Sequence, residues 1–262
     1  HNRLSIFDIS GWVQPFRYQH YSLIFNGEIY NHLELRRHLP QVQFQTQSDT
    51  ETLLHLLLHL GVKGLQKTDG MFAFAFLDTK QELLMLGRDR AGKKPLYYVN
   101  ENNQFLFASE LNSLRAMCRL DIDEREVANY LRVGYFFSPS TVYQGVKSVA
   151  PGSVMSVNTQ SLEYFVEHFY DPMDAYQRKN SALSLEDALR NCDLLLDKSV
   201  KNRMLSSDLE VGAFLSGGID SSLIVALMQQ QSTQPVKTFT IGFSDDSYNE
   251  AKHAKEVAKY LN

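Results

Sequence analysis

The sequence has little cysteine, no long hydrophobic run and no block of basic residues. Its two cysteines, Cys118 and Cys192, cannot build a disulfide framework, so a reducing, cytoplasmic compartment is expected. No apolar run approaches the roughly 18 residues of a membrane-spanning helix, so no membrane partner is expected. Lys and Arg number 26 against 30 Asp and Glu, and this mildly acidic balance argues against a general nucleic-acid-binding protein.

The two ends of the sequence carry none of the signals that usually bound a protein. The chain opens at His1 directly into an apolar segment, residues 1–8, and no secretory signal is visible. At the other end, a helical pattern over 249–261 stops at Asn262 without a polar tail. We therefore expect the chain to be a piece of a longer protein.

Residues 1–170 are rich in strand and hairpin signals, and 44% of the whole chain is hydrophobic, which is enough for a core. Residues 21–25 predict a buried strand that the pair Asn26-Gly27 ends. Large residues at every second position predict a further strand: Phe72, Phe74 and Phe76. A turn over 78–81 and a returning strand are expected to follow it. Residues 105–108 predict one more strand. These patterns favour an antiparallel α+β domain.

Two helices are predicted between these strands. Asn31 followed by Glu34 predicts a helix start with a capping box. Asp49 or Thr50 is expected to cap a second helix over 50–60, whose leucines cover nearly all faces and predict deep burial.

The pattern changes after about residue 170. Residues 171–184 are polar and include a proline, which predicts a linker. Ser184 then caps a long amphipathic helix, and strand, glycine-rich turn, helix, strand and helix follow up to 262. This alternation predicts a parallel sheet with right-handed crossovers. The expected domains are 1–170, the linker 171–184, and the start of an α/β domain over 185–262.

The sharpest motif is the string SGGIDSS, residues 216–222, between a predicted strand and a predicted helix. Its glycines allow backbone N–H groups close to a ligand, and the helix start adds donors and positive dipole character. Together with the serine hydroxyls they predict a phosphate cradle. The alternative is a tight turn with a serine cap. No lysine follows the glycines, so this is not a P-loop. Asp220 beside a phosphate suggests a nucleotide bound with Mg²⁺.

The string SGGIDSS resembles the pyrophosphate-binding loop of ATP pyrophosphatases, and VGAFLSGGIDSSL resembles the synthetase domain of glutamine-hydrolysing asparagine synthetases. The resemblance implies ATP and Mg²⁺ as cofactors, with Asp220 near the metal. The ATP contacts that it implies are Leu215, Ser216, Gly217, Gly218, Asp220, Ser221, Ser222, Ile241 and Gly242.

Six strings in the first region, in order, are similar to the glutaminase domain of the same enzymes: HNRLSI, FNGEIYNH, SDTE, DGMFAFAFLD, GRDRAGKKPLYY and FASEL. These are class II amidotransferases of the N-terminal nucleophile type, which implies a sandwich of antiparallel sheets with flanking helices. The charge cluster in the fifth string, beginning at Arg88 and Asp89, is expected to form a structural ion-pair network near the domain contact.

The resemblance also implies a glutamine pocket. Arg3 would bind the α-carboxylate, with Leu4 beside it, and Asp49 would bind the α-ammonium group. Asn26 and Gly27 would form the oxyanion hole, and Glu28 would complete the pocket. Taken singly, each residue has a plainer interpretation: a surface arginine, a helix cap or a turn pair.

The nucleophile of this family is an N-terminal cysteine, which would lie before residue 1, so the chain alone is expected to be inactive. The resemblance implies that the parent protein makes asparagine from aspartate, with glutamine as nitrogen donor. A β-aspartyl-adenylate forms with ATP, and ammonia passes between two sites. The alternatives are a relative that amidates another carboxylate, such as a polysaccharide sugar acid, or closes a β-lactam ring, and a non-catalytic nucleotide-binding descendant. A homodimer is left open.

Overall fold

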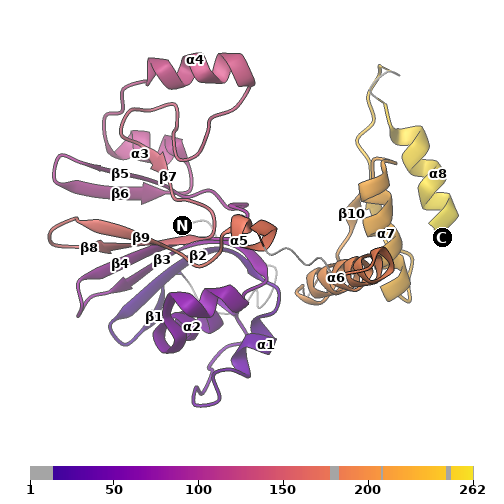
Figure 1. Cartoon of the computed structure of the whole chain (residues 1–262), viewed down its shortest axis with the longest axis horizontal. Coiled ribbons are helices and arrows are strands. Elements are labelled where there is room, and N and C mark those ends of the chain that lie inside the picture. The colour runs from indigo at the N-terminus through magenta and orange to yellow at the C-terminus, as the bar shows by residue number, and fades with distance from the viewer. Residues whose placement is uncertain (1–13, 178–182, 208, 246–248, 262) are drawn as a thin grey trace. The chain divides into compact units, whose positions relative to one another are not determined.

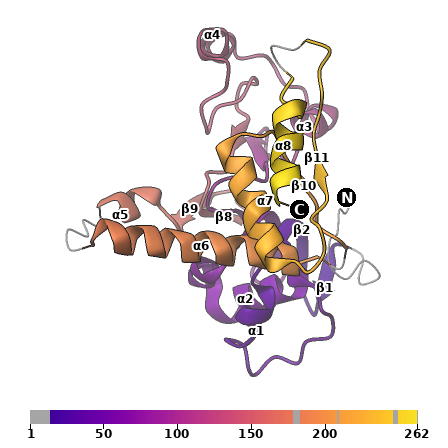
Figure 2. The same cartoon turned by 90° about the vertical axis from the view of Figure 1, so that its right-hand side faces the viewer.

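The computed structural model describes residues 14–177, 183–207, 209–245 and 249–261, and Figures 1 and 2 show it from two sides. The chain divides into two compact units, His1–Arg178 and Lys179–Asn262. In the described ranges, no helix is both long enough and apolar enough to cross a membrane.

The first unit contains two antiparallel sheets. The larger sheet has the strand order β1-β2-β3-β4-β8-β9 and the smaller has the order β6-β5-β7. The strands of the larger sheet are β1 Phe16–Tyr18, β2 Tyr21–Ile29, β3 Gly70–Asp78, β4 Leu83–Arg88, β8 Ser153–Asn158 and β9 Tyr164–His168. Those of the smaller sheet are β5 Tyr97–Glu101, β6 Gln104–Ala108 and β7 Lys147–Ser148.

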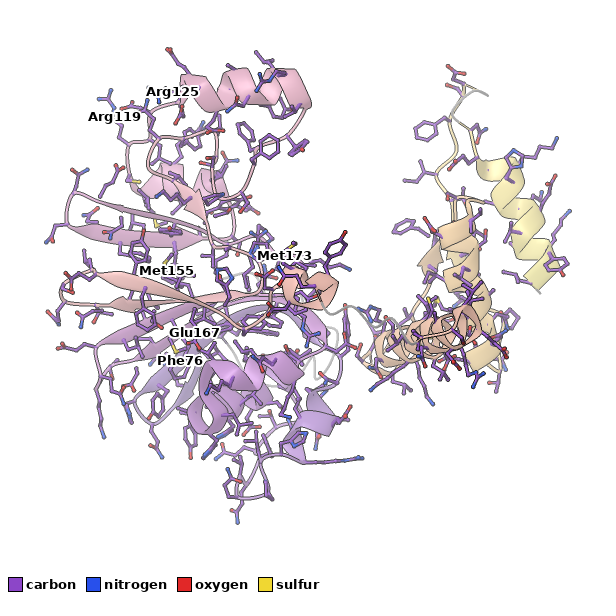
Figure 3. All side chains as sticks on the ribbon, in the orientation of Figure 1. Phe76, Arg119, Arg125, Met155, Glu167 and Met173 are labelled. Atoms are coloured by element: carbon purple, nitrogen blue, oxygen red, sulfur yellow. The ribbon has the colours of Figure 1, made fainter. Side chains whose placement is uncertain are left out.

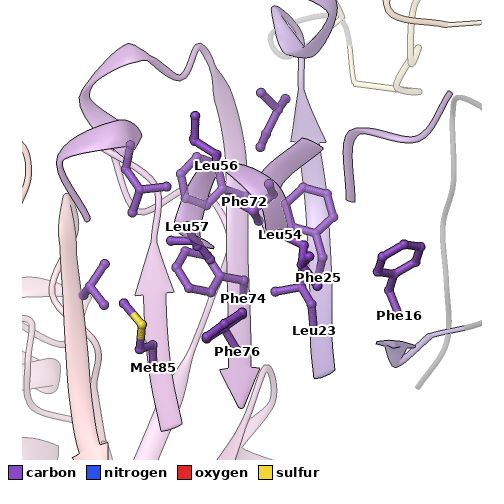
Figure 4. Packing of buried hydrophobic residues seen from close by; sticks show 14 of the residues in the cluster. Phe16, Leu23, Phe25, Leu54, Leu56, Leu57, Phe72, Phe74, Phe76 and Met85 are labelled. Carbon is purple, nitrogen blue, oxygen red and sulfur yellow. The ribbon is translucent and has the colours of Figure 1, made fainter. Parts of the chain in front are cut away.

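Strand β3 separates two cores because its side chains alternate. Its phenylalanines point to one face, where they pack on leucines of helix α2 (Asp49–Gly64), and Figure 4 shows Phe72, Phe74 and Phe76 on that side. Ala73 and Ala75 point to the other face and leave room for the smaller sheet. Figure 3 shows Met155 on the side of the smaller sheet, within this second core. The period-two prediction for β3 is therefore confirmed.

Helices flank both sheets. Helices α1 (His32–Arg36) and α2 and the short η1 (Leu65–Lys67) belong to the outer side of the larger sheet. Helix α3 (Leu111–Met117) packs Leu114 on Val99 and Val146 at the outer side of the smaller sheet. Helix α4 (Glu124–Val133) and helix α5 (Pro172–Gln177) complete the unit, and α5 lies in the segment predicted as a linker. The predicted antiparallel sandwich with flanking helices is confirmed (Figure 1).

Two local predictions around β2 and α1 were wrong. Strand β2 does not end at Asn26-Gly27 but pairs with β3 as far as Ile29, because Gly27 fits directly against the backbone of β3. Asn31 precedes α1 but makes no side-chain cap. Its amide instead accepts the N–H of Asp69 at 2.8 Å and donates to the carbonyl of Lys67 at 2.9 Å. A tertiary partner has therefore replaced the capping box.

The cap of helix α2 lies one residue before the nearer of its two expected positions. The hydroxyl of Ser48 accepts the N–H of Thr50 at 3.1 Å, so the cap is Ser48, and neither Asp49 nor Thr50. The predicted burial is confirmed for four leucines, each at most 6% exposed: Leu53, Leu54, Leu56 and Leu57. It does not extend to the end of the predicted stretch, where Leu60 is 37% exposed.

The second unit contains a small parallel sheet. Strands β10 (Ala213–Phe214) and β11 (Thr238–Phe239) pair in parallel, with helix α7 (Ile219–Gln231) between them in sequence, as predicted. Helices α6 (Leu185–Leu205) and α8 (Ala251–Leu261) complete it (Figure 2). The N–H of Asp187 donates to the hydroxyl of Ser184 at 3.1 Å, which confirms the predicted cap of α6. The strands are shorter than expected.

Candidate functional site

The end of β2 and the start of α2 bring three predicted pocket residues together. Asp49 is the first residue of α2, and its Oδ2 accepts the backbone N–H of Ile29 at 3.0 Å. Glu28, the residue before Ile29, is 3% exposed, and Asp49 is 8% exposed. A buried carboxylate therefore lies directly beside the strand that carries Asn26, Gly27 and Glu28.

Two glycines lie where the pairing of β2 and β3 leaves no room for a side chain. Gly27 has a φ of 151°, and a Cβ there would lie 2.1 Å from the carbonyl oxygen of Met71. A Cβ at Gly70 would lie 2.3 Å from the carbonyl oxygen of Glu28. Real atoms cannot occupy either position without moving the backbone. Gly27 is therefore required by a close approach between strands and not by a turn.

The strand before Asn26 is fixed from its other edge. The side-chain amide of Gln14 donates to the carbonyl of Phe25 at 2.8 Å and accepts the N–H of Phe25 at 2.7 Å. Across the sheet, the carboxylate of Asp89 accepts the N–H of Phe72, the register partner of Gly27, at 3.1 Å. These side chains extend the β ladder on both sides of the predicted oxyanion segment.

Sequence reasoning missed two charged residues that surround the loop before Asp49. The guanidinium of Arg36 donates to the hydroxyl of Thr52 at 2.9 Å, to the carbonyl of Thr46 at 2.8 Å and to the carbonyl of Ser48 at 2.9 Å. The carboxylate of Glu51, 2% exposed, accepts the N–H of Gln45 at 2.8 Å. It also accepts both the N–H and the hydroxyl of Thr46, at 2.7 and 2.8 Å.

Burial changes the proton affinities around this loop. Desolvation lowers the pKa of His32 to about 4, and the positive charge of Arg36 acts in the same direction. Desolvation also lowers the pKa of Arg36, while Glu51 and Asp49 oppose that shift. The pKa of His55 is lowered by burial as well, against the opposing charge of Glu51. Both histidines are therefore favoured in their neutral forms.

The charge cluster at Arg88 and Asp89 bonds to backbone and not to other charges in the part of the chain described. Arg88 donates to the carbonyls of Gly92 and Lys94, each at 2.7 Å, and to that of Val149 at 2.9 Å. Beyond its bond with Phe72, Asp89 accepts three N–H groups within its own loop: those of Ala91, Lys93 and Lys94. The predicted ion-pair network was wrong, because backbone groups take these side chains.

Arg3 and Leu4, the other predicted pocket residues, lie outside the described residues. Asn26 is half-buried on β2 beside Gly27. The structure thus brings Gly27, Glu28 and Asp49 to one place, with Asn26 next to them in the strand.

The second predicted site lies at the carboxyl ends of the two parallel strands. Leu215 follows β10, and its N–H donates to the carbonyl of Phe239 at 2.9 Å. The hydroxyl of Thr240 donates to the carbonyl of Leu215 at 2.7 Å, which holds the segment leading to Ile241 beside the loop. Ligands of open α/β sheets bind at this edge, so the position suits the predicted nucleotide.

The loop over 216–222 is held by its own hydroxyl groups. Ser222 donates to the carbonyl of Gly218 at 2.7 Å, and the hydroxyls of Ser216 and Ser221 share a bond of 3.0 Å. Gly217 has a φ of 88°, and a Cβ there would lie 2.8 Å from the Cβ of His253 on α8.

In the first turn of α7, the N–H of Ser222 donates to the carbonyl of Gly218 at 3.0 Å. The N–H groups of Ile219, Asp220 and Ser221, in contrast, have no intrahelical acceptor and can bind an anion. Asp220 is exposed in that turn, and the described residues contain no group of three metal-ligating side chains. A single carboxylate is compatible with Mg²⁺, which proteins usually bind through one or two carboxylates together with substrate phosphates.

Comparisons with known proteins match both units. A family model described as "Glutamine amidotransferase domain" matches residues 1–170, and one described as "Asparagine synthase" matches residues 191–262. The chain is 38% identical to asparagine synthetase [glutamine-hydrolyzing] 1 of Bacillus subtilis, over 99% of this chain and 41% of that protein.

Two further relatives match the chain over the same share of its length. A putative asparagine synthetase of Mycobacterium tuberculosis is 35% identical over 99% of this chain and 42% of its own length. The asparagine synthetase of Mus musculus is 31% identical over 99% of this chain and 46% of its own length. The chain spans less than half the length of these relatives.

Proposed function

Because the chain belongs, through residues 1–170, to the family of glutamine amidotransferase domains, we propose that the whole protein is a glutamine-dependent asparagine synthetase. The observation that carries the proposal is the order of two family matches on one chain, an amidotransferase domain followed by an asparagine synthase domain. Its relatives named asparagine synthetase align across both units.

In the first unit, we assign the glutamine pocket to the end of β2 and the start of α2. Asp49 binds the α-ammonium group and Arg3 the α-carboxylate, with Leu4 and Glu28 completing the wall. Asn26 and the N–H of Gly27 stabilise the oxyanion that forms when a thiolate adds to the amide carbon. The buried position of Asp49 beside Ile29 supports this assignment, since a desolvated carboxylate attracts an ammonium group strongly.

We assign the thiol of this reaction to neither of the two cysteines of the chain. Cys118 ends helix α3, where its Sγ is within 3.5 Å of the carbonyl of Leu114, and Cys192 is exposed on α6 of the second unit. Neither lies in the pocket that we assign. The family resemblance supplies an N-terminal cysteine, whose own α-amino group acts as the base.

In the second unit, we assign ATP to the loop 215–222 and to Ile241 and Gly242. The N–H groups at the start of α7 would hold the phosphates, and Asp220 would hold Mg²⁺, which would neutralise phosphate charge there. The aspartate side-chain carboxylate attacks the α-phosphorus of ATP and displaces pyrophosphate. The oxygen that now carries the adenylate is a good leaving group for the next step. Ammonia from the first site then attacks the acyl carbon, and AMP leaves with the oxygen.

The test is pyrophosphate release by the full-length protein with Mg-ATP, glutamine and a panel of carboxylic acids. We expect aspartate alone to stimulate release, with asparagine as product. If another acid works and aspartate is inert, the chemistry stands and the acceptor is wrong. If no acid works, the chain is a nucleotide-binding protein and the proposal fails.

A further inference from the structure

We infer that Arg36 positions Asp49 and thereby sets the preference of the first site for a substrate with an α-ammonium group. The inference rests on the proposed function, in which Asp49 binds that group. Arg36 touches no substrate in this account, so it is a positioning residue and not a catalytic one.

The contacts of Arg36 fall on the backbone that leads into Asp49. Two of its three hydrogen bonds go to carbonyl oxygens of the loop 45–48, and one of those belongs to Ser48, the residue directly before Asp49. The third goes to Thr52, one turn into α2. The ring of Phe44 lies 4.2 Å from the guanidinium carbon and covers its face.

Glu51 holds the same loop through its backbone N–H groups. Arg36 donates to carbonyls, whereas Glu51 accepts N–H groups from Gln45 and Thr46. The loop is therefore clamped by a cation on its acceptors and an anion on its donors. Ser48 adds the helix cap, so the first residue of α2 has little freedom to rotate.

Arg36 also connects the two walls of the proposed pocket. It lies on α1, which follows β2 after only Tyr30 and Asn31, so it is tied to the strand that carries Gly27 and Glu28. Its bonds reach the start of α2, which carries Asp49. A shift of this guanidinium would change the distance between the oxyanion segment and the ammonium-binding carboxylate.

A lysine cannot replace this arrangement. The guanidinium places three donors in a rigid planar fork, and the three acceptors here lie on separate residues. A lysine ammonium would keep the positive charge beside Asp49 and Glu51 but would lose the geometry. Arg36→Lys therefore separates positioning from charge.

The experiment compares glutamine with 4-carbamoylbutanoate, which lacks the α-amino group, as substrates of the full-length protein. Wild type should prefer glutamine strongly, and Asp49→Asn should remove most of that preference. We expect Arg36→Lys to lower kcat/KM for glutamine about tenfold or more, while the value for the deamino analogue changes less than about threefold. Arg37→Lys, at the exposed neighbouring residue, should behave as wild type.

An equal loss for both substrates in Arg36→Lys would overturn the inference, because it would show a general structural defect. Amide hydrogen exchange at Ile29 gives a second readout that needs no activity, since that N–H bonds to Asp49. We expect faster exchange at Ile29 in Arg36→Lys, with Leu23 and Ile24 unchanged. If wild type shows no preference for glutamine, the proposed role of Asp49 fails, and exchange at Ile29 still decides whether Arg36 positions it.

Discussion

In the first unit, charged side chains hold the backbone around Asp49, whereas in the second unit the loop at Ser216 is held by its own hydroxyl groups. Arg36, Glu51 and Asp89 each fix three or four backbone or hydroxyl groups in the first unit. The loop of the second unit instead uses short bonds within 216–222. Side chains from outside the loop before Asp49 therefore fix that loop, whereas the loop at Ser216 is fixed by bonds within itself.

The two units also differ in how deeply the leucines of their helices are buried. The leucines at the centre of α2 are fully buried, whereas α6 exposes several leucines, among them Leu185 at 77% and Leu195 at 68%. Buried apolar area is the main source of folding free energy. The first unit should therefore respond strongly to substitutions that the second unit tolerates, and the following predictions test that contrast.

The largest contrast is expected between two glycines. Gly27→Ala places a Cβ within 2.1 Å of a backbone oxygen of β3, so the strands must separate, at a cost of about 3 kcal/mol or more. Gly218→Ala meets only the hydroxyl of Ser216 at 3.4 Å, so its cost should be about 1 kcal/mol or less. Urea denaturation combined with hydrogen exchange in each unit measures both. Similar costs for the two variants would show that the strands at Gly27 are no more tightly packed than the loop at Gly218.

Truncation of leucines tests the cores directly. Leu54→Ala removes a fully buried side chain of α2 and should lower the free energy of unfolding of the first unit by about 3 kcal/mol. Leu195→Ala, at an exposed position of α6, should change the second unit by about 0.5 kcal/mol or less. A loss at Leu195 as large as that at Leu54 would show that α6 is covered in solution.

The pH dependence of the first unit should follow His32. Its folded pKa of about 4 lies below the unfolded value of 6.5, so only the unfolded state takes up a proton between these values. The free energy of unfolding should therefore fall as pH drops from 6.5 to 4, by about 2 to 3 kcal/mol from this residue. Denaturation curves for His32→Gln should lose that part of the slope, whereas His38→Gln, at an exposed position, should keep it. An unchanged slope in His32→Gln would contradict the assignment.

The smallest effect is expected at Ser222. Its hydroxyl donates to the carbonyl of Gly218, and Ser222→Ala should destabilise the second unit by about 0.5 to 1 kcal/mol, the net worth of one exposed hydrogen bond. Thermal denaturation with exchange in α7 measures it. A loss above about 2 kcal/mol would mean that this loop is as rigidly held as the one at Asp49.

Much of the fold could be predicted because periodicity is local. The alternation at Phe72, Phe74 and Phe76 predicts both faces of β3. The need for Gly87 could not be predicted, because the clash of a Cβ there, 2.2 Å from the ring of Phe74, exists only once β3 and β4 pair. The prediction of a capping box at Asn31 was wrong for the same reason. Its amide bonds to Lys67 and Asp69, which lie more than 30 positions further along the chain.

The candidate site shows the same limit. The string SDTE predicts Asp49 through a resemblance, and the structure places that carboxylate beside Ile29. The roles of Arg36 and Glu51 depend on backbone groups of the loop 45–48, and a sequence pattern carries no information on where backbone carbonyls point. Glu51 is the last residue of the string SDTE, and its place in that string was the one signal in the sequence that pointed to it.

The most direct test of the account follows the nitrogen. The full-length protein would be incubated with Mg-ATP, aspartate and glutamine labelled with ¹⁵N in its side-chain amide, and the products followed by NMR. We expect ¹⁵N in the side-chain amide of asparagine, with one AMP formed for each asparagine. Asparagine absent with both glutamine and free ammonia, from a protein shown to be folded, would contradict it.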